Sequence, residues 1–122
     1  MVTINNIEDC KRIVIKVGSS LVTGGSNNID NKFLDSISSD IKYLHDQNKE
    51  IIIVSSGAVA LGNINKNKKK LSLSESQAAS SVGQIKLING WENALKNKGI
   101  EIAQILITAE DTENRRRYLN AR

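Results

Sequence analysis

Two short runs of β-branched and apolar residues stand out along the chain, and each leads into a stretch that contains glycine. Arg12 to Val17 (RIVIKV) precedes Gly18 to Gly25, which predicts a buried strand followed by a loop. Glu50 to Val54 is continuously apolar after its first residue, a pattern typical of a strand covered on both faces. Glu101 to Ile107 predicts a third strand.

Apolar residues at steps of three and four predict helices between these strands. The first helix follows Asp30, which can act as its N-cap, and ends near Asn48. Its apolar positions are Phe33, Leu34, Ile37, Ile41 and Leu44. A second helix opens at Ser55-Ser56-Gly57.

A long helix is predicted before Gly99, because Ser72 and Glu75 have the spacing of a capping box. Its expected apolar stripe is Ala78, Val82, Ile85, Ile88, Trp91 and Leu95. Gly83 and Gly90 inside it each cost about 1 kcal/mol relative to alanine, and close backbone packing is the expected reason for Gly83. Thr108 with Asp111 indicates a further helix start.

The resulting order, β-α-β-α-α-β-α, favours an α/β fold with three αβα layers and a mainly parallel open sheet. The whole of residues 1–122 is expected to form one compact unit. The last predicted helix reaches Arg122 without a glycine, a polar cap or a following strand. We therefore expect a fragment whose sheet is incomplete at the C-terminus.

Composition excludes several classes of protein. Hydrophobic residues make up 39% and charged residues 25%, too apolar for a disordered tail and too polar for a membrane protein. The N-terminus lacks the pattern of a secretory signal, so we expect a cytoplasmic protein. Cys10 is alone, which excludes an internal disulfide, and His45 is also alone, so no metal site is expected.

Positive charge is concentrated in one polar stretch. The formal net charge is +4, and Lys66, Lys68, Lys69 and Lys70 are interleaved with asparagines. No aromatic residue is present there to stack on bases, so a solvated linker is the preferred interpretation. Nucleic-acid binding is the alternative, and it predicts salt-sensitive affinity that depends on these lysines.

The chemistry is expected at the carboxyl ends of the first two strands, where parallel sheets bind ligands. Lys16 offers a fixed cation just before Gly18, Ser19 and Ser20, whose backbone can hold phosphates. Ser55 to Ala58 offers hydroxyls and free amides at a helix start, where an anion is favoured. The alternatives to a phosphate site are that the glycine-serine stretch is an ordinary turn and that Lys16 only contacts solvent. Gly57 and Gly62 have the spacing of a P-loop, but Asn63 and Ile64 stand where a P-loop requires Lys and then Ser or Thr. A P-loop site is therefore not expected.

Arg115, Arg116 and Arg117 form another cationic group. Three consecutive helical residues diverge, so at most one or two could face a single ligand. A solvated or intersubunit surface is preferred.

Several segments together resemble the amino acid kinase family, and among its branches the glutamate 5-kinases. Ile13 to Gly25 is similar to the family's first strand and phosphate loop, whereas the segment from Ile51 to Gly62 is similar to the glutamate-binding segment of that branch. The later matches, in the same order, are Gln77 to Leu87, Gln104 to Thr108 and Arg115 to Arg122.

The resemblance implies ATP-dependent phosphorylation of the glutamate side-chain carboxylate, the first step of proline biosynthesis. It assigns Lys16 to catalysis and ATP binding, with Gly18, Ser19 and Ser20 around the phosphates. Ser56, Gly57 and Ala58 would bind glutamate. Mg²⁺ would arrive with ATP, and a homo-oligomer is implied at full length.

The resemblance also implies that residues 1–122 are the amino-acid-substrate part of the domain and that the nucleotide-binding half is absent. Little activity is expected of the chain alone. Two further alternatives stay open: a related carboxylate or carbamate kinase, and a non-catalytic module that binds an amino acid or serves assembly.

Overall fold

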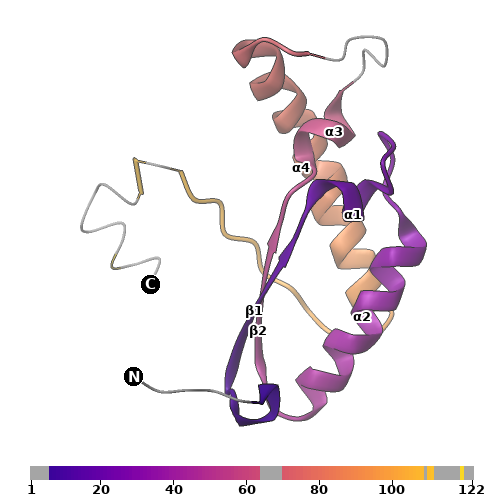
Figure 1. Cartoon of the computed structure of the whole chain (residues 1–122), viewed down its shortest axis with the longest axis vertical. Helices are drawn as coiled ribbons and strands as arrows, with labels where there is room; N and C mark the ends of the chain where they lie inside the picture. The colour runs from indigo at the N-terminus through magenta and orange to yellow at the C-terminus, as the bar shows by residue number, and fades with distance from the viewer. Residues whose placement is uncertain (1–5, 64–69, 109, 112–118, 120–122) are drawn as a thin grey trace.

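The computed structural model describes residues 6–63, 70–108, 110–111 and 119. Strands β1 (Arg12–Val17) and β2 (Glu50–Ser55) pair in parallel, with Val17 opposite Ser55. A short 3-10 helix, η1 (Ile7–Asp9), precedes β1. Helices lie beside this sheet (Figure 1). The α/β class and the first two predicted strands are therefore confirmed.

The stretch after β1 is not a plain loop as predicted, because most of it forms the short helix α1 (Ser19–Thr23). The N–H groups of Leu21 and Val22 both donate to the Gly18 carbonyl oxygen at 3.2 Å. These bonds close a helical turn immediately after the strand, which explains the difference.

Helix α2 (Asn31–Asp46) begins where the sequence predicts. The Asp30 side chain accepts a hydrogen bond from the Phe33 N–H at 3.1 Å, which satisfies one of the donors left free at a helix start. Leu34 and Ile41 are buried on the side that faces the sheet and α4. The helix thus returns the chain to the start of β2.

Helix α4 (Leu73–Lys96) has the predicted capping box, in which Ser72 and Glu75 each bind the other's backbone N–H. Its predicted apolar stripe is confirmed at Trp91 and Leu95, which are buried, and wrong at Val82 and Ile85, which are exposed. The other buried positions of the helix are Ala79, Gly83 and Leu87. These positions recur every four residues, and they are buried in the first half of the helix because the small residues Ala79 and Gly83 allow a neighbouring helix to approach.

That neighbour is α3 (Ala58–Gly62), which packs backbone to backbone against α4. A β-carbon on Gly83 would overlap the Ala58 carbonyl oxygen and lie 2.6 Å from the Gly62 nitrogen. A β-carbon on Gly62 would overlap the Ala79 carbonyl oxygen. The prediction that Gly83 serves close packing is confirmed.

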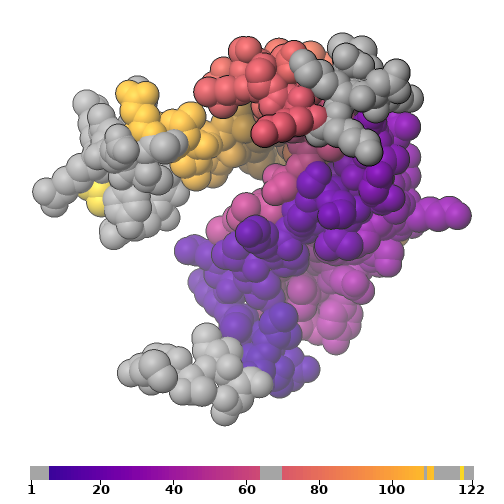
Figure 2. Space-filling view, turned by 45° about the horizontal axis from the view of Figure 1, so that its top comes forward, coloured from indigo at the N-terminus to yellow at the C-terminus, as the bar shows by residue number. Residues whose placement is uncertain are grey.

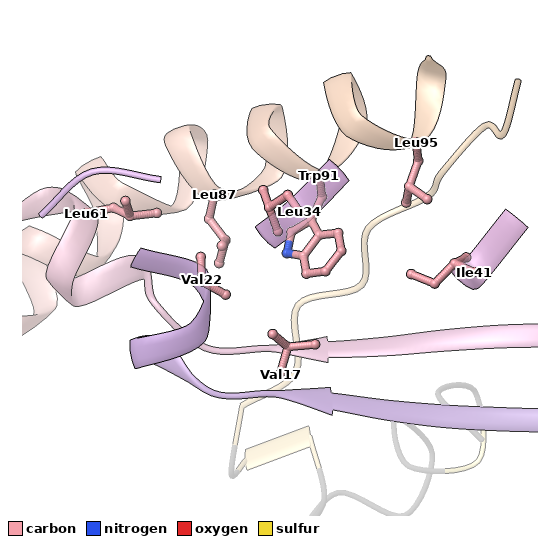
Figure 3. Packing of buried hydrophobic residues seen from close by; sticks show 8 residues of the cluster. All are labelled: Val17, Val22, Leu34, Ile41, Leu61, Leu87, Trp91 and Leu95. Carbon is pink, nitrogen blue, oxygen red and sulfur yellow. The ribbon is translucent and has the colours of Figure 1, made fainter. Parts of the chain in front are cut away.

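One core fills the space between the sheet and the helices (Figure 3). It joins one face of β1 to α1, α2, α3 and α4. Its buried members are Val17, Val22, Leu34, Ile41, Leu61, Leu87, Trp91 and Leu95.

The opposite face of the sheet is open in the described part of the chain. Val14, Ile52 and Val54 are 61%, 46% and 49% exposed. The prediction that β2 is covered on both faces is therefore wrong for Ile52 and Val54, because the helices of the core pack on the other side of the sheet. We call Val14, Ile52 and Val54 the free face.

The predicted third strand is also absent from the described residues. Ile100 and Ile102 pack on the core, whereas Ile105 and Leu106 are about 70% exposed and join no ladder. Apolar alternation favours a strand only where a partner supplies hydrogen bonds. Glu110 and Asp111 are helical, and the Thr108 N–H donates to the Asp111 carboxylate at 2.7 Å, in agreement with the helix start predicted at Thr108. Most of that predicted helix lies outside the described residues.

Candidate functional site

The carboxyl ends of β1 and β2 lie side by side. Val17 is the register partner of Ser55, and the Ser56 N–H donates to the Val17 carbonyl oxygen at 2.9 Å. The stretch that begins at Gly18 therefore starts beside the stretch that begins at Ser56. The structure brings together the two segments in which the sequence predicts phosphate and amino-acid binding, at the usual ligand-binding edge of a parallel sheet.

Lys16 lies one residue before the end of β1, opposite Val54. It is exposed, and strand alternation places it on the free face. It forms no ion pair with any residue that the structure describes. No charge in the described part of the protein therefore neutralises Lys16, and its ammonium group is available to bind an anion.

Gly18, Ser19 and Ser20 form the start of α1. The first amides of a helix have no acceptor within it, so those of Ser19 and Ser20 are suited to an anion. A β-carbon on Gly18 would meet no atom of the described residues within 4 Å. Packing within the described part of the chain therefore does not explain the glycine.

Ser56, Gly57 and Ala58 connect β2 to α3. Ser56 is exposed, but its amide is already bound to Val17, so the prediction that the amides of this segment are free is wrong for Ser56. Gly57 is buried with φ 122°, and a β-carbon there would lie 3.3 Å from Val22. A glycine is needed at this turn because other residues rarely adopt that conformation.

The carbonyl oxygen of Ala58 is directed at Gly83, because a β-carbon on Gly83 would overlap it. That side of Ala58 therefore serves the contact between α3 and α4. The predicted roles of these three residues in binding an amino acid remain predictions.

Two neighbours of the site were not found from the sequence. The Trp91 indole N–H donates to the Ser55 hydroxyl oxygen at 2.9 Å, although Trp91 counted only as an apolar position. The Lys86 ammonium donates to the Leu61 carbonyl oxygen at 3.2 Å, at the end of α3. A buried tryptophan usually needs an acceptor for its N–H, which was the available signal for the first contact.

Other predicted features lie away from the strand ends. Cys10 is a free thiol between η1 and β1, and His45 is exposed in the last turn of α2, as expected. Lys70 is exposed. Lys66, Lys68, Lys69, Arg115, Arg116 and Arg117 fall outside the described residues, so their interpretations stay predictions.

Among the residues that the structure describes, no group of three His, Cys, Asp or Glu side chains could hold a metal ion. No helix in the same part of the chain is long and apolar enough to cross a membrane.

A groove of about 450 Å³ lies between α4 and the extended segment that follows it. Its lining is Ser80, Ser81, Gln84, Ile85, Ile88, Gln104 and Leu106. Because none of the predicted site residues lines it, we place the candidate site at the strand ends.

Curated bacterial glutamate 5-kinases align with nearly all of this chain. It is 48% identical over 118 residues to the glutamate 5-kinase of Pelagibacter ubique strain HTCC1062, covering 95% of this chain and 32% of that protein. It is 45% identical over 121 residues to the glutamate 5-kinase of Brucella abortus strain S19, covering 98% of this chain and again 32% of the relative. The chain thus spans about a third of the length of these relatives.

The model of the amino acid kinase family matches residues 11–122, a range that includes both strands and all the helices of the core. The parallel strands with adjacent carboxyl ends agree with that match. The chain belongs to the amino acid kinase family.

Proposed function

We propose that this chain supplies the amino-acid end of an enzyme that transfers the terminal phosphoryl group of ATP to the side-chain carboxylate of glutamate. The observation that carries the proposal is the contact between Ser56 and Val17, which brings the two segments together. A phosphate held near Gly18 would then lie beside an amino acid held near Ser56. The relatives named glutamate 5-kinase support glutamate as the acceptor.

Lys16 has the main electrostatic role in this proposal. An ammonium about 4 Å from a phosphoryl oxygen contributes on the order of 4 kcal/mol at an effective dielectric constant of 20. Transfer moves negative charge toward the bridging oxygen of the leaving ADP, so a fixed cation stabilises the transition state. The amides at the start of α1 would orient the phosphates.

The reaction needs no general base from this chain, since the glutamate carboxylate is ionised at neutral pH. A carboxylate oxygen forms a bond to the γ-phosphorus, the bond from that phosphorus to the β-phosphate oxygen breaks, and ADP leaves. Mg²⁺ would enter with ATP as part of the substrate and neutralise phosphate charge. The products are glutamyl 5-phosphate and ADP, which would begin proline biosynthesis.

Because the chain spans about a third of the relatives' length, we propose that further sequence completes the nucleotide site. A hybrid enzyme tests this directly. The aligned stretch of the Pelagibacter ubique enzyme is replaced by this chain, and coupled ADP release is measured with glutamate, aspartate and carbamate as acceptors. Glutamate-dependent turnover by the hybrid, and little by the 122-residue chain alone, are expected.

Substitution of Lys16 then tests the site. We expect Lys16→Met to lower kcat of the hybrid by about 100-fold, as for removal of a donor to developing charge. Lys96→Met is the matched control, because Lys96 is exposed in the last turn of α4. Equal kcat values for Lys16→Met and Lys96→Met would contradict a catalytic role of Lys16. Glutamate binding without any response to ATP would instead favour a non-catalytic module.

A further inference from the structure

We propose that Trp91 is a positioning residue for the amino-acid substrate and that it acts through Ser55 on the turn that carries Ser56. This inference rests on the proposed function. It assigns to a residue of the core a role in substrate affinity that its burial alone does not imply.

The geometry begins with a hydrogen bond that joins α4 to the end of β2. Trp91 is 4% exposed, and its indole lies in the core between α4 and the sheet (Figure 3). Its N–H donates to the Ser55 hydroxyl oxygen at 2.9 Å. The two residues are 36 positions apart in the sequence, so this contact fixes the strand end relative to the long helix.

Ser55 passes this constraint to the next residue. Its hydroxyl accepts from Trp91 and donates to the Ser56 carbonyl oxygen at 3.1 Å. A serine hydroxyl has one proton, so this donation fixes its orientation. With its proton directed at the Ser56 carbonyl oxygen, the Ser55 hydroxyl presents a lone pair to the Trp91 N–H, so each hydrogen bond favours the other.

The peptide groups of Ser56 are consequently held on both sides. Its N–H donates to the Val17 carbonyl oxygen, and its carbonyl oxygen accepts from Ser55. The exposed side chain of Ser56 remains as the group that can meet a ligand. Fixing the backbone in this way places that hydroxyl before the substrate arrives, which lowers the entropic cost of binding.

Phenylalanine at position 91 would retain most of the buried ring but not the N–H. In the hybrid enzyme we expect Trp91→Phe to raise KM for glutamate by about threefold to tenfold, the usual effect of losing one hydrogen bond. KM for ATP and kcat should change by less than about twofold. Ser55→Ala should act in the same way, whereas Ser55→Thr retains the hydroxyl and should restore the parent KM.

A control separates positioning from loss of core packing. Leu95→Val removes volume from the same stripe of α4, one helical turn beyond Trp91 and on the side of Ile41 (Figure 3), and Leu95 is not the residue that bonds Ser55. It should lower the unfolding temperature without raising KM for glutamate. If Trp91→Phe and Leu95→Val change both KM values equally, Trp91 has only a packing role and the inference is overturned.

The contact itself can be observed in the 122-residue chain, because Trp91 is its only tryptophan. The single indole N–H signal in a ¹⁵N NMR spectrum should exchange slowly with solvent, and Ser55→Ala should accelerate the exchange. Fast exchange in the parent chain would overturn the inference. A hybrid without glutamate turnover would contradict the proposed function. Normal turnover with an unchanged KM for glutamate in Trp91→Phe would contradict only the role of Trp91.

Discussion

Gly62 of α3 and Gly83 of α4 face each other so closely that neither position has space for a β-carbon. This crossing anchors α3 directly after the turn at Gly57, and α3 in turn fixes where that turn ends. Two residues without side chains therefore allow α3, which follows the second site segment, to pack directly on α4. The first turns of α4 lie at the top of the surface in Figure 2.

Substitution of Gly83 by alanine should be strongly destabilising. The added methyl group would overlap the backbone oxygen of Ala58, which cannot rotate away. Overpacking of this kind exceeds the gain in helix propensity, so we expect a loss of about 2 kcal/mol or more in the free energy of unfolding. Urea denaturation measures it.

Gly90→Ala is the matched control for Gly83→Ala, since both glycines lie inside α4. A β-carbon on Gly90 would meet the terminal methyl group of Ile29, which can change rotamer. Its effect should be clearly smaller. Equal losses for the two variants would contradict the backbone contact between α3 and α4.

Gly57→Ala tests the conformation of the turn after β2. Because φ is 122° and Val22 lies behind the turn, we expect a loss of about 1 to 3 kcal/mol. Gly25→Ala serves for comparison: φ is 79° there, and no atom of the residues that the structure describes lies within 4 Å of the added carbon. Thermal unfolding should show the larger decrease for Gly57→Ala, and the reverse order would argue against the buried turn.

Asp30→Ala should remove the N-cap of α2 and cost about 1 kcal/mol. Asp30→Asn retains an acceptor for the Phe33 N–H, so most of the stability should return. Asp40→Ala, at an exposed position of the same helix, is expected to change stability by less than about 0.5 kcal/mol. A similar loss in Asp40→Ala would show that helix charge, rather than the cap, is responsible.

The two faces of the sheet can be compared by the same isosteric change. Val17 is 1% exposed and Val54 is 49% exposed. Val17→Thr buries a hydroxyl group and should cost about 1 to 3 kcal/mol, whereas Val54→Thr should cost less than about 0.5 kcal/mol. Equal costs in urea denaturation of the 122-residue chain would mean that the free face is covered.

Local signals predicted much of this structure. Asp30 and the pair Ser72 and Glu75 identified two helix starts, because a cap depends on residues at most three positions away. The β-branched runs identified β1 and β2 for a similar reason. The adjacency of their carboxyl ends followed from the rule for parallel crossovers, so the position of the candidate site was also predictable.

Contacts between distant segments account for the errors. The buried stripe of α4 was misplaced because Ala79 and Gly83 face α3, a contact that periodicity within α4 does not reveal. The free face and the unpaired segment around Ile105 depend on which side the helices occupy and on which partner a strand finds. The bond from Trp91 to Ser55 likewise joins residues far apart in sequence.

The core has a consequence for how this protein is made. Its members and the residues packed on them all lie between Ile15 and Ile102, so it can close on the ribosome as soon as that part of the polypeptide has emerged. In that folded part the side chains of Val14, Ile52 and Val54 are 61%, 46% and 49% exposed. A folding intermediate that closes this core but exposes apolar strand residues on its other face is the kind of species that aggregates at high concentration.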